Sequence, residues 1–268
     1  MKKLLTLLLL FIVGMTGMAQ APVTNTAFKN GEVLKYTLRF SVGPAWMDVG
    51  TAEWRVAAGT YNGQSGHKVT VRTMTNSRAD RYFVLRDTMV TYVTPKLVPL
   101  YFDKKGREGK RYKRDWVKYS YSGGQCHVNS WHRTDKNTPK TCNYNSKTCA
   151  YDMVSMMIRA RSLDASKWQV GHRESFILAD GKHCTKQAFV YRGKQTIKLD
   201  GTKTKYRCLV FSYMDTEDGK ESELVKFYIS DDANHLPVRL DMNFRFGSAK
   251  AFLTSATGLR NAQTSKVQ

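Results

Sequence analysis

The residue types best able to do chemistry in this chain are its five cysteines and six histidines. Cys126, Cys142 and Cys149 lie in one polar stretch, and Cys184 and Cys208 follow in a strand-rich region. The leader described below predicts export to an oxidising compartment, where disulfides are the default state of thiols. The short separation of Cys142 and Cys149 favours a disulfide between them.

Other pairings stay open, because five cysteines cannot all pair within one chain and a sequence does not fix their connectivity. Cys184 and Cys208 lie on nearby predicted strands and could pair across a sheet. Cys126 would then be left over, or it pairs with Cys142 or Cys149 instead. No signature of a thiol enzyme flanks Cys126, so an unpaired Cys126 is interpreted as a buried structural thiol.

Two Cys-His pairs offer ligands that zinc or copper accepts: Cys126-His127, with His132 nearby, and His183-Cys184. Their spacing is not that of a zinc finger or ribbon, and adjacent residues on a strand face opposite sides. Asp231-Asp232-Ala233-Asn234 lacks the spacing and closing glutamate of a calcium loop, and is typical of a turn. We therefore predict no metal and no cofactor.

The motifs of common hydrolases and nucleotide-binding proteins are missing from the sequence. It contains no Gly-x-Ser-x-Gly elbow, no His-Glu-x-x-His and no glycine-rich phosphate loop between a strand and a helix. Ser155 has no evident base beside it, and Asp103 and Glu108 lie in a charged hairpin. We predict no catalytic residues and no enzymatic activity. A glycan-active enzyme, which needs two facing carboxylates in a pocket, remains an alternative.

One stretch of the chain after the leader has a convincing helical period, Tyr151–Leu163. Asp152 can cap it by accepting a hydrogen bond from a backbone N–H of the first turn. Its apolar side is formed, at spacings of three and four, by Met153, Met156, Met157 and Ala160. We predict a single short helix that packs against the apolar face of a sheet.

Nearly all of the remaining chain alternates between apolar and polar residues, as in Val33–Phe40 and Val238–Phe246. Such alternation is typical of antiparallel strands with one face on the core. Asp180-Gly181, Arg192-Gly193 and Asp200-Gly201 predict hairpin turns. The sequence shows no internal repeat and no linker. We therefore predict one all-β domain, residues 20–268, built as a large curved or barrel-like antiparallel sheet.

Three segments are predicted to depart from this regular pattern. Lys104–Arg114 is densely basic and is interpreted as an exposed hairpin connection. Gln125–Cys149 is the least regular stretch, and the last dozen residues are expected to be frayed.

The N-terminus has the features of a signal peptide, Met1–Ala19. Lys2 and Lys3 precede an apolar run, Leu4–Val13, and Gly17-Met18-Ala19 supplies a cleavage site. The apolar run is shorter than the ~20 residues of a transmembrane helix. We predict a protein of the periplasm or outer envelope surface of a Gram-negative bacterium, peripheral rather than transmembrane.

Cleavage after Ala19 would leave 41 basic and 22 acidic residues, a net charge of +19. Such a balance favours an anionic envelope lipid or glycan, while export argues against nucleic acid. The candidate anionic-partner surface consists of Lys104, Lys105, Arg107, Lys110, Arg111, Lys113 and Arg114. Simple solubility explains the charge equally well.

Inward-facing apolar side chains could line a ligand cavity or only form the core. The candidates are Trp54, Met153, Met156, Met157, Phe244 and Phe246. Methionine adapts to irregular apolar shapes, which suits either role. The core interpretation is favoured, since apolar alternation needs no ligand to explain it.

Several short motifs follow one another in a characteristic order. They are Gly31-Glu32-x-Leu34-x-Tyr36, Gly50-Thr51-Ala52, Arg86-Asp87, Pro99-Leu100-Tyr101-Phe102, Glu108-Gly109-Lys110-Arg111, Asp152-Met153-Val154-Ser155 with Arg159, Ser230-Asp231-Asp232 and Leu236-Pro237-Val238-Arg239. Together they resemble the exported bacterial family catalogued as domain of unknown function 3108, over Phe28–Thr254. The resemblance implies an exported, mostly β protein and brings no established activity.

The sequence thus predicts a non-enzymatic envelope protein that binds a lipid, a glycan or another envelope component. A structural or assembly factor that works through protein contacts is the alternative, with the basic hairpin as its candidate contact surface.

Overall fold

The computed structural model describes residues 22–42, 45–200, 202–217, 220–244 and 247–267. The predicted signal peptide and Phe246 therefore lie outside the described residues.

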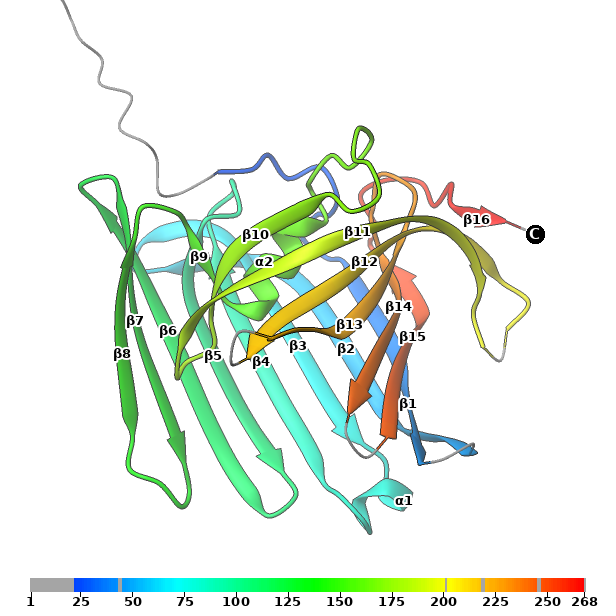
Figure 1. The fold of residues 1–268 in the computed structure, drawn as a ribbon, viewed down its shortest axis with the longest axis horizontal. Helices are drawn as coiled ribbons and strands as arrows, with labels where there is room; N and C mark the ends of the chain where they lie inside the picture. The colour runs from blue at the N-terminus through cyan, green and yellow to red at the C-terminus, as the bar shows by residue number, and fades with distance from the viewer. Residues whose placement is uncertain (1–21, 43–44, 201, 218–219, 245–246, 268) are drawn as a thin grey trace, which may run out of the picture.

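The described residues form one large β-sheet and two short helices (Figure 1). The strands are β1 (Val33–Val42), β2 (Ala45–Tyr61), β3 (Gln64–Thr75), β4 (Leu85–Val93), β5 (Pro99–Glu108), β6 (Arg111–Ser122), β7 (Gln125–Thr134), β8 (Lys140–Ser146), β9 (Ala150–Tyr151), β10 (Arg173–Ala179), β11 (Cys184–Lys198), β12 (Lys205–Glu217), β13 (Lys220–Ser230), β14 (Pro237–Phe244), β15 (Gly247–Thr257) and β16 (Lys266–Val267). The helices are α1 (Ser77–Asp80) and α2 (Met153–Ala160).

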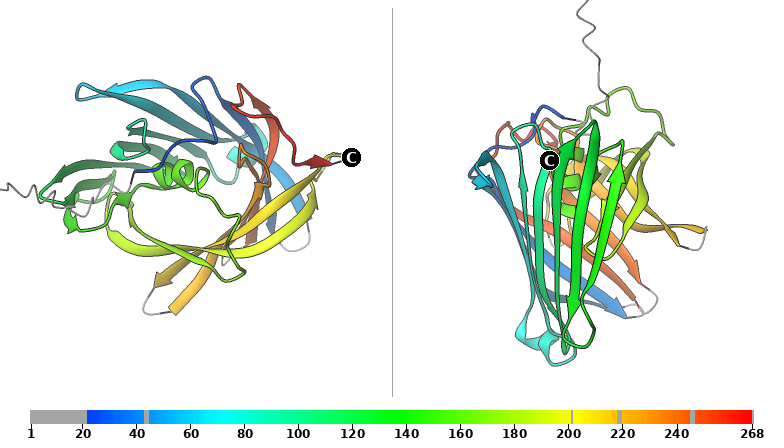
Figure 2. Two further views of the ribbon diagram at one scale, coloured as in Figure 1. Left: turned by 90° about the horizontal axis from the view of Figure 1, so that it is seen from above. Right: turned by 90° about the vertical axis from the view of Figure 1, so that its left-hand side faces the viewer.

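The strand order is β8-β7-β6-β5-β4-β3-β2-β1-β15-β14-β13-β12-β11-β10-β9, with β16 beside β12. Every pairing is antiparallel except that of β9 with β10. Pairing of β1 with β15 joins two meanders, and the sheet curls almost into a barrel around α2 (Figure 2). The prediction of a curved, barrel-like antiparallel sheet is confirmed.

The gap between β8 and β9, the two ends of this sheet, is called the seam below. The β10–β11 turn packs across it, because a Cβ at Gly181 would lie 2.7 Å from Cβ of Asp115 on β6. A side chain there would have no room, and Gly181 also has a positive φ of 97° that favours glycine.

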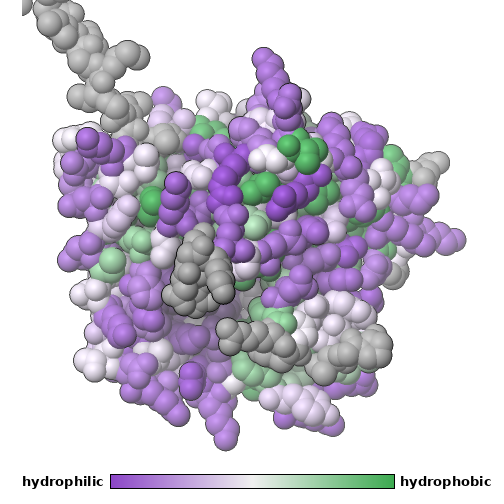
Figure 3. Space-filling view, in the orientation of Figure 1, coloured by the Kyte–Doolittle hydropathy of each residue, from purple (hydrophilic) through white to green (hydrophobic). Residues whose placement is uncertain are grey.

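The alternation of each strand explains why the sheet curls around a core. Leu34 and Tyr36 on β1 lie opposite Trp54 and Ala52 on β2, and the first three are buried. The outer faces carry most of the charge, so the face in Figure 3 is largely hydrophilic, with apolar side chains in small groups.

Helix α2 begins where its capping signal predicts. The Asp152 carboxylate accepts hydrogen bonds from the backbone N–H groups of Val154 and Ser155, and Ser155 Oγ accepts one from the Asp152 N–H. This reciprocal capping box fixes the first turn. The helix buries Val154, Met156 and Ile158 against the sheet.

Lys104–Arg114 forms a hairpin, as expected, most of it within β5 and β6. Three other predictions of local structure are wrong. Gln125–Cys149 contains two regular strands, β7 and β8. Arg192-Gly193 is a bulge inside β11 instead of a turn. The C-terminal residues are packed rather than frayed: Ser265 is fully buried and Lys266–Val267 pairs with β12. Among the described residues, no helix has the length and apolar character needed to cross a membrane.

Candidate functional site

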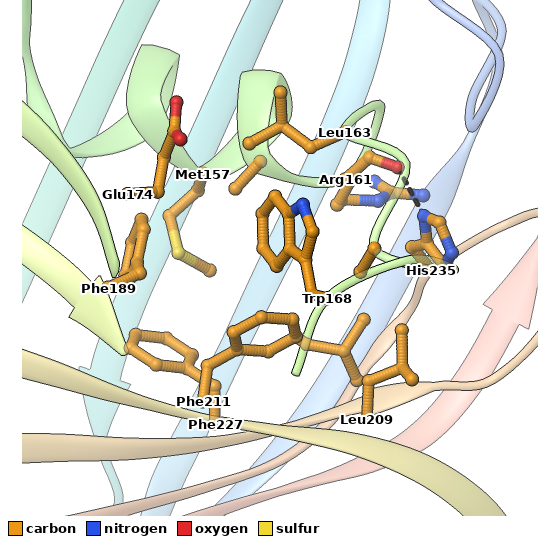
Figure 4. A pocket seen from close by; sticks show the side chains of 13 residues that line it. Met157, Arg161, Leu163, Trp168, Glu174, Phe189, Leu209, Phe211, Phe227 and His235 are labelled. Atoms are coloured by element: carbon orange, nitrogen blue, oxygen red, sulfur yellow. Dashed lines mark hydrogen bonds between the residues drawn. The ribbon is translucent and has the colours of Figure 1, made fainter. Parts of the chain in front are cut away.

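An apolar slot lies between α2 and the inner face of strands β10 to β13 (Figure 4). Three parts of the chain form it: the inner side of α2, the connection from α2 to β10, and an aromatic wall on the strands. The lining residues are Met157, Ala160, Arg161, Leu163, Ala165, Trp168, Glu174, Phe189, Leu209, Phe211, Phe227, Ile229 and His235.

The aromatic wall arises from strand register. Phe211 lies opposite Phe227 on the neighbouring strand, so their rings share one face. Phe189 and Phe227 meet edge to face, with ring centroids 5.8 Å apart. Trp168 packs edge-on against Phe211 at 6.0 Å and against Tyr191 at 6.5 Å, and it stacks on His172 at 4.3 Å. The wall is therefore held by aromatic pairs of favourable geometry.

The slot is nearly filled by its own side chains. Its cavity volume is about 40 Å³, enough for a water molecule but far below the ~300 Å³ of typical small-molecule pockets. Trp168 and Met157 project into it from opposite sides (Figure 4). A ligand would therefore have to displace one of these two side chains.

A buried ion pair anchors the end of α2 at one side of the slot. Arg161 is 2 % exposed, and its guanidinium donates to both carboxylate oxygens of Glu32, at 2.7 and 2.9 Å. It also donates to the backbone carbonyl of Asn234, and the Arg161 carbonyl bonds to His235 Nδ1 at 2.6 Å. The helix is thus fixed to the N-terminal segment and to the β13–β14 connection.

A second, more open depression of about 370 Å³ lies beside the N-terminal segment. Its lining includes Lys29, His67, Lys96 and Arg260. Burial lowers the pKa of His67, as does the charge of Arg260. This depression is open to solvent, so it lacks the enclosed shape of the slot.

The structure separates the five candidate ligand or core residues that it describes. Trp54 and Met156 are buried in the core, and Met157 lines the slot. Met153 is 56 % exposed and Phe244 49 % exposed, so neither lines an interior cavity. Met153 lies on the same side of α2 as Met157 and Ala160, but it occupies the first position of the helix, where it is left exposed.

The predicted Cys142–Cys149 disulfide is not formed in this structure, in which all five cysteines are free. The Cys126 thiol is hydrogen bonded to that of Cys149, and the Cys142 thiol to that of Cys184. A Cys184–Cys208 pair is also excluded, because Cys208 lies opposite Gln195 on β11. Cys142 and Cys149 are kept apart because Cys142 lies within β8 and Cys149 leads into β9, at the other side of the seam.

No group of three or more His, Cys, Asp and Glu side chains is placed to hold a metal within the described ranges. His127 instead bonds Ser122 and Asn145 on the outer face.

The basic hairpin does not present all of its charges to solvent. Lys104 forms ion pairs with Asp87 at 3.3 Å and Glu108 at 3.4 Å inside the sheet, and Lys113 also pairs with Glu108. Lys105 and Arg114 pair with Asp103. Only Arg107, Lys110 and Arg111 of the seven predicted residues remain exposed without an ion pair to a described residue.

A polar network inside the lower half of the sheet was not predicted from the sequence. Burial is the largest influence on the pKa values of Asp87 and Asp115 and raises both. His132 Nδ1 lies 2.5 Å from the Asp115 carboxylate. The signal was present in the sequence as polar residues at inward positions of otherwise alternating strands.

The residues that form the slot were also missed, apart from Met157. Phe189, Phe211 and Phe227 occupy inward positions of predicted strands, so their alternation marks them as core. Trp168 lies in an irregular connection, and no local pattern places it against a particular strand.

A family model described as "Protein of unknown function (DUF3108)" matches residues 35–254. The chain belongs to the DUF3108 family. A search of curated proteins finds no match. The fold of this DUF3108 protein is similar to that of a β-barrel-like protein of the DUF1849 family from Brucella abortus, with a TM-score of 0.55 and 13% identity over 86% of this chain and 98% of that chain.

A second solved structure is a protein with a YmcC-like fold, proposed to be exported, from Bacteroides fragilis NCTC 9343. It matches at 9% identity over 88% of this chain and 99% of that chain, with a TM-score of 0.34, too low to establish a shared fold.

Three motifs that resemble the DUF3108 pattern have structural roles in this DUF3108 protein. Glu32 holds Arg161, Asp152 caps α2, and the Asp232 carboxylate accepts hydrogen bonds from Ser230, Asn234 and Ser265. All three fix connections around α2 and the chain ends rather than form a reactive site.

Proposed function

We propose that this DUF3108 protein is a non-enzymatic exported protein of the cell envelope that binds an apolar ligand chain, such as the acyl chain of a lipid. The slot beneath α2 is the binding site in this proposal. The observation that carries it is the aromatic wall of Phe189, Phe211 and Phe227. Met157 and Trp168 face this wall, and the cavity left between them is too small for a ligand unless a side chain moves.

Trp168 is the side chain that a ligand would replace. It lies on the connection between α2 and β10, outside any helix or strand, while the wall that it covers is built of paired strands. An acyl chain in its place would keep the apolar contacts of the wall. Burial of each CH₂ group contributes about 0.8 kcal/mol.

The pairing of the interior carboxylates supports the non-enzymatic part of the proposal. Asp87 and Glu108 are both paired with Lys104, and Asp115 with His132. Two-carboxylate glycan hydrolysis requires one acid and one base that face a common space. A glycan-active enzyme therefore has less support here than a binding protein.

A fluorescent polyene fatty acid tests the site directly. Ala160→Phe would fill the slot from α2, while Met153→Phe places the same side chain at the exposed first position of the same helix, two turns away. We expect saturable binding to the unmodified protein and to Met153→Phe, and its loss in Ala160→Phe.

Two outcomes would count against the proposal. One is the absence of saturable binding together with no lipid that co-purifies in native mass spectrometry. The other is equal binding by both variants, which would place the fatty acid outside the slot. A thermal melt of each variant shows whether it is folded.

A further inference from the structure

The end of the sheet farthest from α2 combines exposed apolar side chains with a dense positive charge. This basal end is defined as residues 45–47, 74–86, 107–114 and 133–140, and it contains α1 and the tips of the β5–β6 and β7–β8 hairpins (Figure 1). Strands of an antiparallel meander reverse at each turn, so these alternate turns lie at the same end.

Most of the exposed large apolar side chains of the described residues gather there. Six of ten such residues belong to the basal end: Trp46, Met47, Met74, Tyr82, Phe83 and Tyr112. Tyr82 is the extreme case, at 87% exposed. The turns at the opposite end between β2 and β3 and between β6 and β7 contain none. Clustered exposed apolar side chains mark an interaction surface.

Contacts between the turns make the basal end one surface. The Gly109 N–H donates to the Val84 carbonyl at 2.7 Å, and a Cβ at Gly109 would lie 3.2 Å from the Phe83 ring. On the other side of α1, the Asn76 amide donates to the Asp48 carbonyl at 2.8 Å. The apolar side chains of the β1–β2 hairpin, of the α1–β4 connection and of the β5–β6 hairpin are thereby held beside one another.

The charge of the same surface is strongly positive. The basal end contains eleven basic residues and three acidic ones. Arg78, Arg81, Lys110 and Arg111 are exposed and form no ion pair with any described residue. Their charges are therefore available to an anionic partner.

We propose that the basal end docks this protein onto the surface of a bilayer that contains anionic lipids. Tyr and Trp side chains favour the membrane–water interface, where an apolar ring and a polar group are both accommodated. Lys and Arg near an anionic bilayer each contribute attraction to its surface. A soluble polyanion would satisfy only the charges and leave Tyr82 and Phe83 in water. This surface is separate from the slot and does not depend on it.

Sedimentation with vesicles tests the docking surface, with one set of pure phosphatidylcholine and one of phosphatidylcholine mixed equally with phosphatidylglycerol. We expect binding to the mixed vesicles only, weakened by salt. Each basic residue at the surface contributes about fivefold to partitioning, so neutralising three should weaken binding on the order of 100-fold.

The test variant combines Arg81→Gln, Lys110→Gln and Arg111→Gln. The matched control removes the same charge from exposed positions outside the basal end: Lys147→Gln, Lys167→Gln and Lys203→Gln. We expect the control to bind close to the unmodified protein. Tyr82→Ser should weaken binding several-fold and keep that effect at high salt, because it removes an apolar contribution.

Three results would overturn the proposal. The first is equal binding to both kinds of vesicle, or to neither. The second is an equal loss of vesicle binding in both triple variants, which would mean that binding depends on the net charge of the protein and not on the basal end. The third is retention of a soluble anionic glycan with no vesicle binding. The slot variant Ala160→Phe should bind vesicles normally, so that failure of this proposal and failure of fatty acid binding are distinguishable. All substituted basic side chains are exposed, and a thermal melt checks that each variant folds.

Discussion

At the scale of single residues, the thiols are arranged in two pairs, and both pairs cross the seam. Cys126 is on β7 and Cys149 leads into β9, while Cys142 is on β8 and Cys184 begins β11. The shared hydrogen bond, together with burial, raises the pKa of Cys149, and the same bond lowers that of Cys126 to about 7. Cys126 is thus the thiol more readily deprotonated for disulfide exchange.

We expect Cys126–Cys149 and Cys142–Cys184 to form when the protein is oxidised by a small-molecule disulfide, with Cys208 left free. Each bond releases two protons and two electrons, which the external disulfide accepts as it becomes two thiols. Non-reducing peptide mapping by mass spectrometry identifies the connectivity. A Cys142–Cys149 peptide would contradict this arrangement. Oxidised protein should also be more stable, by about 2–4 kcal/mol per bond.

Two adjacent methionines of α2 differ in what they contact. Met156 is 2 % exposed and packs in the core with Phe176, Phe189 and Phe227, whereas Met157 borders the slot. Met156→Ala should lower the free energy of unfolding by about 2–5 kcal/mol. Met157→Ala should cost less, since part of the space next to it is already empty. Urea unfolding measures both, and a larger loss for Met157→Ala would reverse the packing assignment.

At the scale of elements, the N-terminal cap of α2 is the buried carboxylate of Asp152. Burial disfavours its ionised form, and hydrogen bonds favour it. Burial is the largest influence on the pKa of Asp152 and raises it from the ordinary value of 3.8, although hydrogen bonds from Ser155, Thr91 and Val154 favour the ionised form. Ionisation therefore costs more in the folded state than in the unfolded state. Stability from this group is complete below the unfolded pKa and declines as pH rises through the folded pKa.

Two variants, Asp152→Ala and Asp152→Asn, distinguish the effect of the capping hydrogen bonds on stability from the effect of the buried negative charge. Alanine removes the acceptor of two backbone N–H groups and should cost about 1–2 kcal/mol at low pH, and less as the pH rises through the folded pKa of Asp152. Asparagine keeps the accepting oxygen, and its amide can donate to Thr91 Oγ1. We expect Asp152→Asn to gain stability relative to the unmodified protein as the pH rises above ~4, the ordinary pKa of an aspartate. Urea unfolding across this range checks the sign, and equal losses in both variants would contradict it.

Most elements were predictable from local pattern, and the exceptions share a physical cause. Alternation placed β1 and β14, and Asp152 marked the start of α2, because those signals lie within a few residues of each other. Arg192-Gly193 imitates a turn, yet the strand continues through a bulge because β12 supplies partners on both sides. The slot depends on which strands close around α2, and that closure rests on the β1–β15 pairing, more than 200 residues apart in sequence.

At the scale of the whole molecule, the segment before β1 and the segment after β15 meet at the β13–β14 connection. Asn234 is fully buried, and its amide donates to the carbonyls of Asn261 and Ala262 at 3.0 and 3.1 Å. The Asn261 amide in turn donates to the carbonyls of Thr26 and Ala233. These bonds join the N-terminal segment, the C-terminal segment and a loop that also holds Arg161. Local polarity suggested a frayed terminus, because the buried partners lie far away in sequence.

Removal of residues 258–267 should therefore destabilise the entire sheet, although the segment is short and polar. It leaves the Asn234 amide without its two acceptors, and the Asp232 carboxylate without Ser265. An unsatisfied buried polar group costs about 1–3 kcal/mol, so two such groups should lower the free energy of unfolding by several kcal/mol. Asn261→Ala should show a smaller loss, because it retains its backbone bonds to Asn234. Urea unfolding of the truncated protein with unchanged stability would mean that the terminus does not close the fold.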